Sequence, residues 1–508
     1  MSLLNVVNVS HNFGGRQILK NASFRLLKGE HVGIVGANGE GKSTFINIIL
    51  GNELPSEGKI EWAKRLNIGY LDQYSTLTKG KTIRDVLKEA FAYMYEMEQQ
   101  IYKNYELMAD CDDAKMEELL FDIGEMQSML EQSGFYMIDA KIEEISKGLG
   151  LNVIGLDKDV TELSGGERAK VLLTKVLLQN PGILILDEPT NYLDENHINW
   201  LKNYLNNFEN AFILVSHDTA FLNSVINVVY HIDNGELTRY SGNYEDFQKT
   251  YEIKKRQNEM AYEAQQKEIK QMEDFIARNK ARVATRGMAN SRQKKLDKLE
   301  RLDKGRVQYK PNFIFKEGRP SGKILFRGEN LVLGYGKPLT KPFDIEIVKG
   351  EHVVIKGING VGKSTLIKTL LGLIKPFSGI AEKSPTVTLG YFEQEVEGNR
   401  NTPRDEIWDM FPTLTQGEVH AALAACALTS EHIESQIITL SGGEAAKVRL
   451  CKLTIGEYNC LVLDEPTNHL DVLAKESLSE AINDYKGTVL LFCHEAEFYK
   501  NVASRVIN

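Results

Sequence analysis

The sequence predicts an α/β protein in which two copies of one domain, residues 1–241 and 322–508, are joined by a long helical hairpin over 242–321. Two observations predict this arrangement. A set of short motifs occurs twice in the same order, and the stretch 245–284 between the two sets contains neither proline nor glycine. The 508 residues, 42% apolar and 26% charged, suffice for about three folded units with ordinary cores.

The first repeated motif is Gly-x-x-x-x-Gly-Lys-Ser, which spans 36–43 and recurs at 357–364, an offset of 321 in the numbering. In the first copy it follows a short apolar run and opens an amphipathic helix, a context in which backbone N–H groups enclose phosphate oxygens. We expect the lysines to reach the β- and γ-phosphates of a nucleotide and the serines to bind Mg²⁺. The residues expected to form these two loops are Gly36, Asn38, Gly39, Gly41, Lys42, Ser43, Thr44, Gly357, Asn359, Gly360, Gly362, Lys363, Ser364 and Thr365.

Each copy also contains an apolar run that ends in two acids, Asp187 and Glu188 in the first and Asp464 and Glu465 in the second, at an offset of 277. Such a run predicts a buried parallel strand whose carboxyl end delivers its side chains to a site. We expect the first acid of each pair to hold Mg²⁺ through water and the second to polarise the attacking water. The alternative, that the acids only cap the next helix, does not explain the matched pair.

One histidine in each copy follows a further apolar run, and His217 and His494 have the same offset as the two acidic pairs. A single histidine at the end of a strand would be unremarkable. Its equal spacing in both copies predicts a sensor of the γ-phosphate.

The offset between the copies falls from 321 at the first motif to 277 at the later ones, so the first copy holds 44 extra residues between Gln73 and Ser164. We expect them near 88–133, as an arm of two antiparallel helices. Residues 86–133 contain twelve Asp and Glu against three Lys, so the arm is acidic. It is either a solvated hairpin without a partner or a contact for a basic protein surface.

The stretch between the copies is basic, with seventeen Lys and Arg against nine Asp and Glu over 251–310. We expect one helix over 245–284, about 60 Å long at about 1.5 Å per residue, and a second over 291–306 with Gly287 near the turn. A charge run is usually a solvated face, but a projecting basic tip on an acidic protein favours phosphate contact. The residues expected to contact RNA are Arg278, Lys280, Arg282, Arg286, Arg292, Lys294 and Lys295.

The bulk properties exclude several classes of protein. No run of about 18 apolar residues encodes a membrane span, and the N-terminus lacks a charged leader followed by an apolar segment, so we expect a cytoplasmic protein without a membrane partner. Five scattered cysteines without a C-x-x-C pair fit a reducing compartment and provide no zinc or iron–sulfur framework. The net charge of −9 by itself argues against nucleic acid, but the charge is unevenly distributed along the chain.

Together these motifs resemble those of ABC ATPases. Leu-Ser-Gly-Gly-Glu at 163–167 and at 440–444 resembles the signature of that family. The resemblance implies two ABC-type nucleotide-binding domains in one monomer that close head to tail over two ATP molecules, so that each signature completes the site of the other copy. It implies that Ser441, Gly442 and Gly443 face Lys42, and that Ser164, Gly165 and Gly166 face Lys363. It also implies Mg²⁺ contacts from Gln73 and Gln394, and adenine stacking on Phe13 and Tyr335.

Within that superfamily the chain resembles the ABC-F branch almost end to end. Asp-Glu-Pro-Thr-Asn-x-Leu-Asp occurs at 187–194 and 464–471, and Tyr240-Ser241-Gly242-Asn243-Tyr244 leads into the basic hairpin. The resemblance implies an ATPase that binds the E-site region of the ribosome when closed on ATP and is released by hydrolysis. It implies a linker directed at rRNA and the P-site tRNA, and an arm near the stalk, where its acidity favours a basic ribosomal protein. A housekeeping translation factor and an antibiotic-resistance protein remain equally open.

Two alternative classes remain. The energising subunit of a membrane transporter would have ABC-type domains, but it gives no role to the basic hairpin. A protein of DNA repair or chromosome upkeep would also have such domains, but usually with much longer coiled coils or zinc modules.

Overall fold

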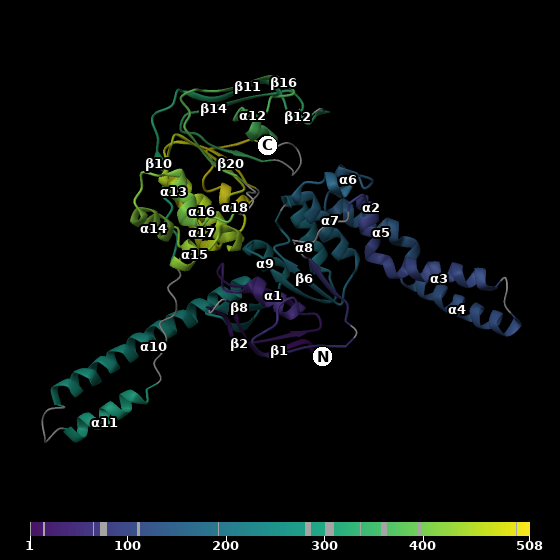
Figure 1. The fold of residues 1–508 in the computed structure, drawn as a ribbon, viewed down its shortest axis with the longest axis horizontal. Coiled ribbons are helices and arrows are strands. Elements are labelled where there is room, and N and C mark those ends of the chain that lie inside the picture. The colour runs from purple at the N-terminus through teal and green to yellow at the C-terminus, as the bar shows by residue number, and fades with distance from the viewer. Residues whose placement is uncertain are drawn as a thin grey trace.

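The computed structural model describes residues 2–13, 16–64, 66–71, 79–108, 112–191, 193–279, 286–299, 309–335, 337–356, 363–393, 399–493 and 495–507. The expected fold class is confirmed: two α/β domains are linked through a helical hairpin (Figure 1). Within the described residues, no helix is both long enough and apolar enough to cross a bilayer.

The first domain is built on a six-stranded sheet of order β5-β6-β7-β3-β8-β9, which is parallel except for its last pair. These strands are β3 (His31–Val35), β5 (Ile68–Leu71), β6 (Ile183–Asp187), β7 (Ala211–Val215), β8 (Val228–Asp233) and β9 (Glu236–Ser241). A smaller antiparallel sheet of order β2-β1-β4 contains β1 (Ser2–Phe13), β2 (Arg16–Leu27) and β4 (Glu57–Trp62).

Two apolar clusters enclose the six-stranded sheet, because successive strand residues point to opposite faces. Ile183 and Ile185 pack with α1 (Lys42–Leu50) and the smaller sheet, whereas Leu184 and Leu186 pack on the opposite face. The other helices of this domain, apart from the arm, are α2 (Ile83–Lys88), α5 (Ile138–Gly148), α6 (Leu151–Ile154), α7 (Gly165–Leu178), α8 (Glu195–Asn206) and α9 (Thr219–Val225).

The second domain repeats this architecture, with a five-stranded parallel sheet of order β17-β19-β20-β15-β21 and a small sheet of order β14-β11-β16. The strands are β11 (Ile324–Val332), β14 (Phe343–Val348), β15 (His352–Ile355), β16 (Ser378–Lys383), β17 (Leu389–Phe392), β19 (Cys460–Asp464), β20 (Thr488–Phe492) and β21 (Arg505–Ile507). The helices are α12 (Lys363–Leu370), α13 (Pro403–Met410), α14 (Gln416–Ala425), α15 (Ser430–Glu434), α16 (Gly442–Ile455), α17 (Val472–Asp484) and α18 (Ala496–Tyr499). Both sheets place their phosphate-loop strand, β3 or β15, beside the strand that ends before the histidine.

Two helical hairpins project from opposite ends of the molecule (Figure 1). One is the arm, formed by α3 (Ala92–Met108) and α4 (Asp113–Gln132), and Ile101 and Ile123 bury their side chains between its helices and the domain. The other is the linker hairpin, formed by α10 (Tyr244–Asn279) and α11 (Arg286–Asp297), in which Ile269 and Ile276 of α10 are buried.

The linker hairpin differs from its expected bounds in three respects, one of which is that α11 ends at Asp297 rather than at 306. α11 begins at 286 rather than 291, so Gly287 lies in its first turn instead of in the connection. The first-turn N–H groups of a helix have no partner within it, which makes a glycine there less costly than in the interior. The linker also ends before residue 321, because Phe313 and Phe315 are buried in the core of the second domain.

Candidate functional site

The first glycine-rich loop connects β3 to α1, and its backbone is shaped to enclose an anion. Gly39 and Gly41 have φ angles of 77° and 96°, the left-handed region that favours glycine. Gly36 lies so close to β8 that an added Cβ would be 2.7 Å from the carbonyl oxygen of Ile232. Because α1 starts at Lys42, the loop N–H groups and the positive end of the helix converge on one point.

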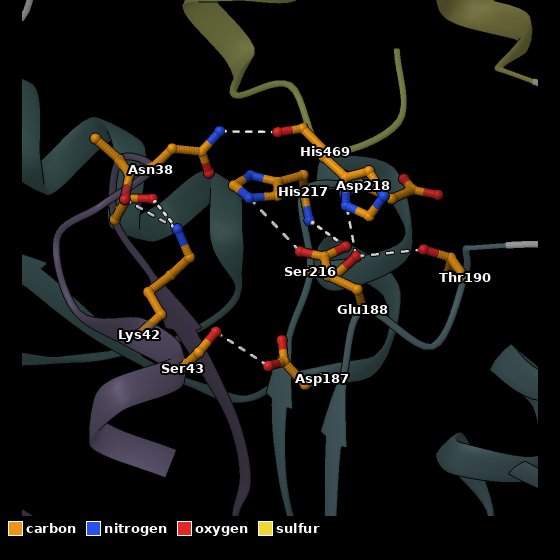
Figure 2. A network of polar contacts seen from close by, with 12 residues as sticks. Asn38, Lys42, Ser43, Asp187, Glu188, Thr190, Ser216, His217, Asp218 and His469 are labelled. Atoms are coloured by element: carbon orange, nitrogen blue, oxygen red, sulfur yellow. Dashed lines mark hydrogen bonds and ion pairs between the residues drawn. The ribbon is translucent and has the colours of Figure 1, made fainter. Parts of the chain in front are cut away.

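The lysine of this loop is buried and turned into it. Lys42 Nζ donates hydrogen bonds to the carbonyl oxygens of Gly36, at 2.8 Å, and Ala37, at 3.0 Å (Figure 2). Only 8% of Lys42 is exposed, and burial lowers its pKa, because the ammonium loses hydration.

The two acids at the end of β6 face the same loop (Figure 2). Ser43 Oγ donates to Asp187 Oδ2 at 3.2 Å. Glu188 Oε2 accepts the backbone N–H of His217 at 3.3 Å, and Glu188 Oε1 lies 3.6 Å from His217 Nε2. The structure thus brings together the lysine, serine, two acids and histidine that the spacing of the first copy had selected.

Burial sets the ionisation of this cluster. Burial, reinforced by the carboxylate of Asp187, raises the pKa of Glu188 to about 8. Burial also raises the pKa of Asp187 itself. It lowers the pKa of His217, and the ammonium of Lys42 lowers that pKa further. A carboxyl group whose pKa is raised toward neutral pH, beside an imidazole whose lowered pKa keeps it neutral, is suited to exchanging a proton with water.

Both acidic pairs share a backbone feature that composition does not show. Glu188 and Glu465 each have a φ of 49°, a left-handed conformation that is uncommon for a residue with a side chain. Strain of this kind persists where the surrounding structure fixes it, and it turns each glutamate out of the line of its strand.

The second domain closes over the first glycine-rich loop. Asn38 Nδ2 donates to the carbonyl oxygen of His469 at 2.8 Å (Figure 2). A Cβ added to Gly443 would lie 2.6 Å from that same oxygen, and one added to Gly39 would lie 2.8 Å from Glu444 Oε1. We call this assembly the first composite site, formed by residues 36–44, 187–188 and 217 of the first domain with 441–444 and 469 of the second.

Each signature segment forms the N-terminus of a helix. Ser164 caps α7 and Ser441 caps α16, and each forms a capping box with the glutamate three residues later, Glu167 or Glu444. The N–H groups and the positive end of α16 therefore face the loop of the first domain, which suits a negatively charged ligand between them.

The second composite site, in which we expect the loop at 357–364 to face Ser164, Gly165 and Gly166, is described only in part. An ion pair between Lys356 Nζ and Glu195 Oε2, at 4.0 Å, joins the domains there. Asp464 is buried at the end of β19, and Thr365 is buried in α12. The expected residues outside the described ranges are Gly357, Asn359, Gly360, Gly362, Gln394 and His494 of this site, Gln73 of the first, and Lys280 and Arg282 of the linker hairpin.

Other expected residues are placed only through their backbone. Phe13 ends β1, Tyr335 lies in the short strand β12 (Gly334–Tyr335), and Lys363 and Ser364 begin α12; their side chains are outside what the structure describes. Adenine stacking on the two aromatic residues therefore stays a prediction.

Some residues of the first composite site were not anticipated. His469 occupies the variable position of Asp-Glu-Pro-Thr-Asn-x-Leu-Asp and contributes through its carbonyl oxygen, which no residue type reveals. Behind Glu188, Ser216 Oγ lies 3.5 Å from Thr190 Oγ1 and accepts the N–H of Asp218 at 3.1 Å. The motif Asp-Glu-Pro-Thr-Asn-x-Leu-Asp continues in both copies past its first two acids to a shared Leu-Asp, which was a signal that the residues after those acids also have a role.

The residues present fit ATP and Mg²⁺. The loop at 36–43 has left-handed glycines, a helix N-terminus and a buried lysine, which together match a polyphosphate. The hydroxyl of Ser43 and the carboxylate of Asp187 are hard oxygen donors 3.2 Å apart, the ligands Mg²⁺ prefers alongside phosphate oxygens and water.

The basic residues of the linker hairpin fall into two groups. Arg278 and Lys294 are exposed on α10 and α11. Arg292 stacks on the ring of Phe275, with 3.7 Å between the guanidinium carbon and the ring centroid, and Lys295 Nζ pairs with Glu268 Oε1 at 2.9 Å. The second pair of cations therefore also holds the two helices together. Arg286 begins α11, and its side chain is not described.

Family models match most of the chain, and curated relatives match along the whole of it. A model described as ABC transporter matches residues 19–191 and 340–468, and a second with the same description matches 230–315. The uncharacterized ABC transporter ATP-binding protein YfmM of Bacillus subtilis (strain 168) is 56% identical over 509 residues, 100% of this chain and 98% of the relative. ABC transporter F family member 2 of Arabidopsis thaliana is 35% identical over 515 residues, 98% of this chain and 75% of the relative.

Solved structures agree with the tandem architecture. RNase-L Inhibitor aligns with a TM-score of 0.57 at 20% identity, covering 98% of this chain and 87% of that chain. A model of ribosome-bound archaeal Pelota and ABCE1 aligns with a TM-score of 0.57 at 21% identity, covering 98% and 76%. At this identity the similarity concerns the fold.

Proposed function

This chain belongs to the ABC-F family of tandem ABC ATPases, and from that premise we propose that it binds the ribosome while closed on ATP and leaves it after hydrolysis. ATP hydrolysis itself follows from the two ABC domains. The proposal is that this hydrolysis sets the time spent on the ribosome, as a two-state switch controlled by nucleotide.

The proposed chemistry of the first composite site uses the side chains described above. Lys42 and the loop N–H groups hold the β- and γ-phosphates, and Ser43 and Asp187 hold Mg²⁺, which neutralises charge on the phosphate oxygens. Glu188 accepts a proton from the attacking water, and His217 contacts the γ-phosphate. Glu465 and His494 have the same roles in the second composite site, where Ser364, Asp464 and Gln394 bind the metal.

The observation that carries the ribosome proposal is the basic linker hairpin, which projects from an otherwise acidic chain of net charge −9 (Figure 1). A projecting cationic tip concentrates positive potential where it meets a polyanion. We propose that this tip contacts rRNA and the P-site tRNA from the E-site region. This contact is compatible with modulation of translation. It is equally compatible with protection or rescue of ribosomes, including protection from antibiotics. We propose that the protein acts in the cytoplasm as a monomer.

The arm supports a second ribosomal contact. Its acidic helices expose large apolar side chains, among them Tyr102 at 60% and Phe121 at 66%. Exposed aromatic groups on an acidic surface indicate a protein-binding face, and their charge favours a basic partner. We propose a basic ribosomal protein as the partner of the arm.

A ribosome-pelleting experiment tests the proposal. Glu188→Gln combined with Glu465→Gln keeps the shape of both side chains but removes the proton acceptor, so ATP should be trapped and the protein should sediment with ribosomes severalfold more than wild type. Glu162→Gln with Glu497→Gln, two exposed acids, is the matched control and should behave as wild type. Equal sedimentation of the trapped variant and wild type would rule out nucleotide gating.

A further inference from the structure

The two signature serines use their hydroxyl protons differently. Ser164 Oγ donates to Glu167 Oε2 at 2.8 Å, and the same oxygen accepts Ser164 N–H at 2.8 Å. Ser441 N–H donates to Glu444 Oε2 at 2.9 Å, and Ser441 Oγ accepts Glu444 N–H at 3.3 Å. Within the described residues the hydroxyl of Ser441 donates no bond, so its proton is free for another acceptor.

A histidine lies beside the other carboxylate oxygen of Glu444. His432 Nε2 lies 3.2 Å from Glu444 Oε1, with the two side chains only 15% and 10% exposed. The backbone N–H of Thr429 donates to His432 Nδ1 at 3.4 Å. Because Nδ1 accepts, the neutral ring carries its proton on Nε2 and donates it to Glu444.

The contact belongs to one copy only. At the offset that aligns the two signatures, the first copy has Gly155 in place of His432. The signature glutamate also lies at the domain interface, since a Cβ on Gly39 of the opposite loop would be 2.8 Å from Glu444 Oε1. His432 therefore fixes a carboxylate that faces the first composite site.

We propose that His432 is a positioning residue of the first composite site: it holds Glu444 so that the Ser441 hydroxyl keeps its proton for the γ-phosphate of the nucleotide on Lys42. In the second composite site, Ser164 must first break its bond to Glu167. The first composite site is therefore the tighter ATP site of the two. This inference rests on the proposed nucleotide binding at both composite sites.

A purely structural role for His432 is the competing explanation, because the residue also completes the capping box of α15 with Thr429. Three substitutions separate the two roles. Glutamine keeps both the cap and an N–H donor; glutamate keeps the cap but places a negative charge beside Glu444; alanine removes both.

The experiment measures binding of MgAMPPNP to the purified full chain in two backgrounds. Lys363→Met disables the second composite site, so binding then reports on the first. Lys42→Met disables the first composite site, so binding then reports on the second. Without further change, the first background should bind the analogue more tightly. His432→Glu and His432→Ala should weaken binding to the first composite site about tenfold, as expected when a hydrogen bond to a charged group is removed, and leave the second within about twofold. His432→Gln should restore wild-type affinity.

Two results would overturn the inference. If His432→Glu binds as wild type does, the histidine is only a cap; if both composite sites weaken equally, the substitution acts on folding. His420→Ala is the matched control, since His420 pairs with Glu434 on the same helical subdomain, 3.5 Å away. Ribosomes are absent from this measurement, so its failure leaves the ribosome proposal untouched, and failure of ribosome binding leaves this measurement interpretable.

Discussion

At the scale of single residues, the domain interface depends on positions that have no room for a side chain. Gly443 approaches the carbonyl oxygen of His469 and the side-chain amide of Asn38 across the first composite site. Protein interiors are packed closely enough that one added methyl group forces a shift of the surrounding atoms. Here the atoms that would have to move belong to different domains.

Gly443→Ala should therefore reduce ATP turnover by about tenfold or more, since a misplacement of about 1 Å at a reacting centre is costly. Steady-state phosphate release from the purified protein measures the effect. Thermal unfolding should change little, because an alanine in the first turn of α16 is compatible with a helix.

The control for this substitution is Gly417→Ala in α14, where no heavy atom lies within 4 Å of an added Cβ. It should retain wild-type turnover. Wild-type turnover in Gly443→Ala would mean that the domains do not meet at this position during the cycle.

The residues of this interface also show which site residues can be predicted from the sequence. Lys42, Asp187 and Glu188 could be selected from sequence, because phosphate loops and strand-end acids need fixed residue types at fixed spacing. His469 could not, because it contributes a backbone oxygen. His432 could not, because its partner Glu444 is twelve residues away and only the fold brings the two side chains together.

At the scale of elements, the linker hairpin is held together by the same kind of residue that is expected to bind RNA. Arg292 and Lys295 contact Phe275 and Glu268 of the neighbouring helix. Arg278 and Lys294 are exposed cations on the same hairpin. Arg292 and Lys295 are exposed too, but they are also engaged with α10, so Arg278 and Lys294 should account for more of the salt dependence of ribosome binding.

Arg278→Gln with Lys294→Gln should weaken ribosome binding and lower the slope of log affinity against log salt by about one unit for each phosphate contact that the substitutions remove. Sedimentation at several salt concentrations gives that slope. Lys255→Gln with Arg256→Gln, nearer the start of α10, is the control and should leave the slope unchanged. Equal slopes for this variant and wild type would mean that Arg278 and Lys294 are solvated and contact no phosphate.

The bounds of elements were less predictable than their existence. The absence of proline and glycine indicated a long first linker helix. The second helix begins earlier than expected because the penalty for Gly287 is small in a first turn. The return segment was assigned to the linker by composition, but the aromatic pair Phe313 and Phe315 docks on the second domain through long-range packing that local sequence does not show.

At the scale of the whole molecule, the two ends of the linker are attached to elements that meet at the first composite site. Phe247 of α10 is part of the first-domain core, and its neighbour Tyr251 packs against His231 of β8, with 4.7 Å between ring centroids. At the other end, Phe313 N–H donates to Ser477 Oγ of α17 at 3.4 Å. α17 begins shortly after His469, and β8 lies beside Gly36. Because His469 and Gly36 lie on opposite sides of the first composite site, closing of that site should bring the two attachment points of the hairpin, at Tyr251 and Phe313, together.

This arrangement predicts that the projecting part of the hairpin can be removed without loss of ATPase activity. Replacing 258–308 with a Gly/Ser segment of about 20 residues, whose ends average about 25 Å apart, keeps both attachment points. The two domains should still close, and ATP turnover should stay within about twofold of wild type, because the described contacts of the first composite site lie outside the excised range. Sedimentation with ribosomes should fall to background, even with Glu188→Gln and Glu465→Gln present.

A matched variant that keeps the hairpin but carries the same Gly/Ser segment inserted in the exposed turn at 28–29, between β2 and β3, controls for the insertion itself. If excision abolished turnover while the protein remained folded, the hairpin would be a structural brace for the ATPase; if ribosome binding survived, the arm and not the linker would carry the attachment.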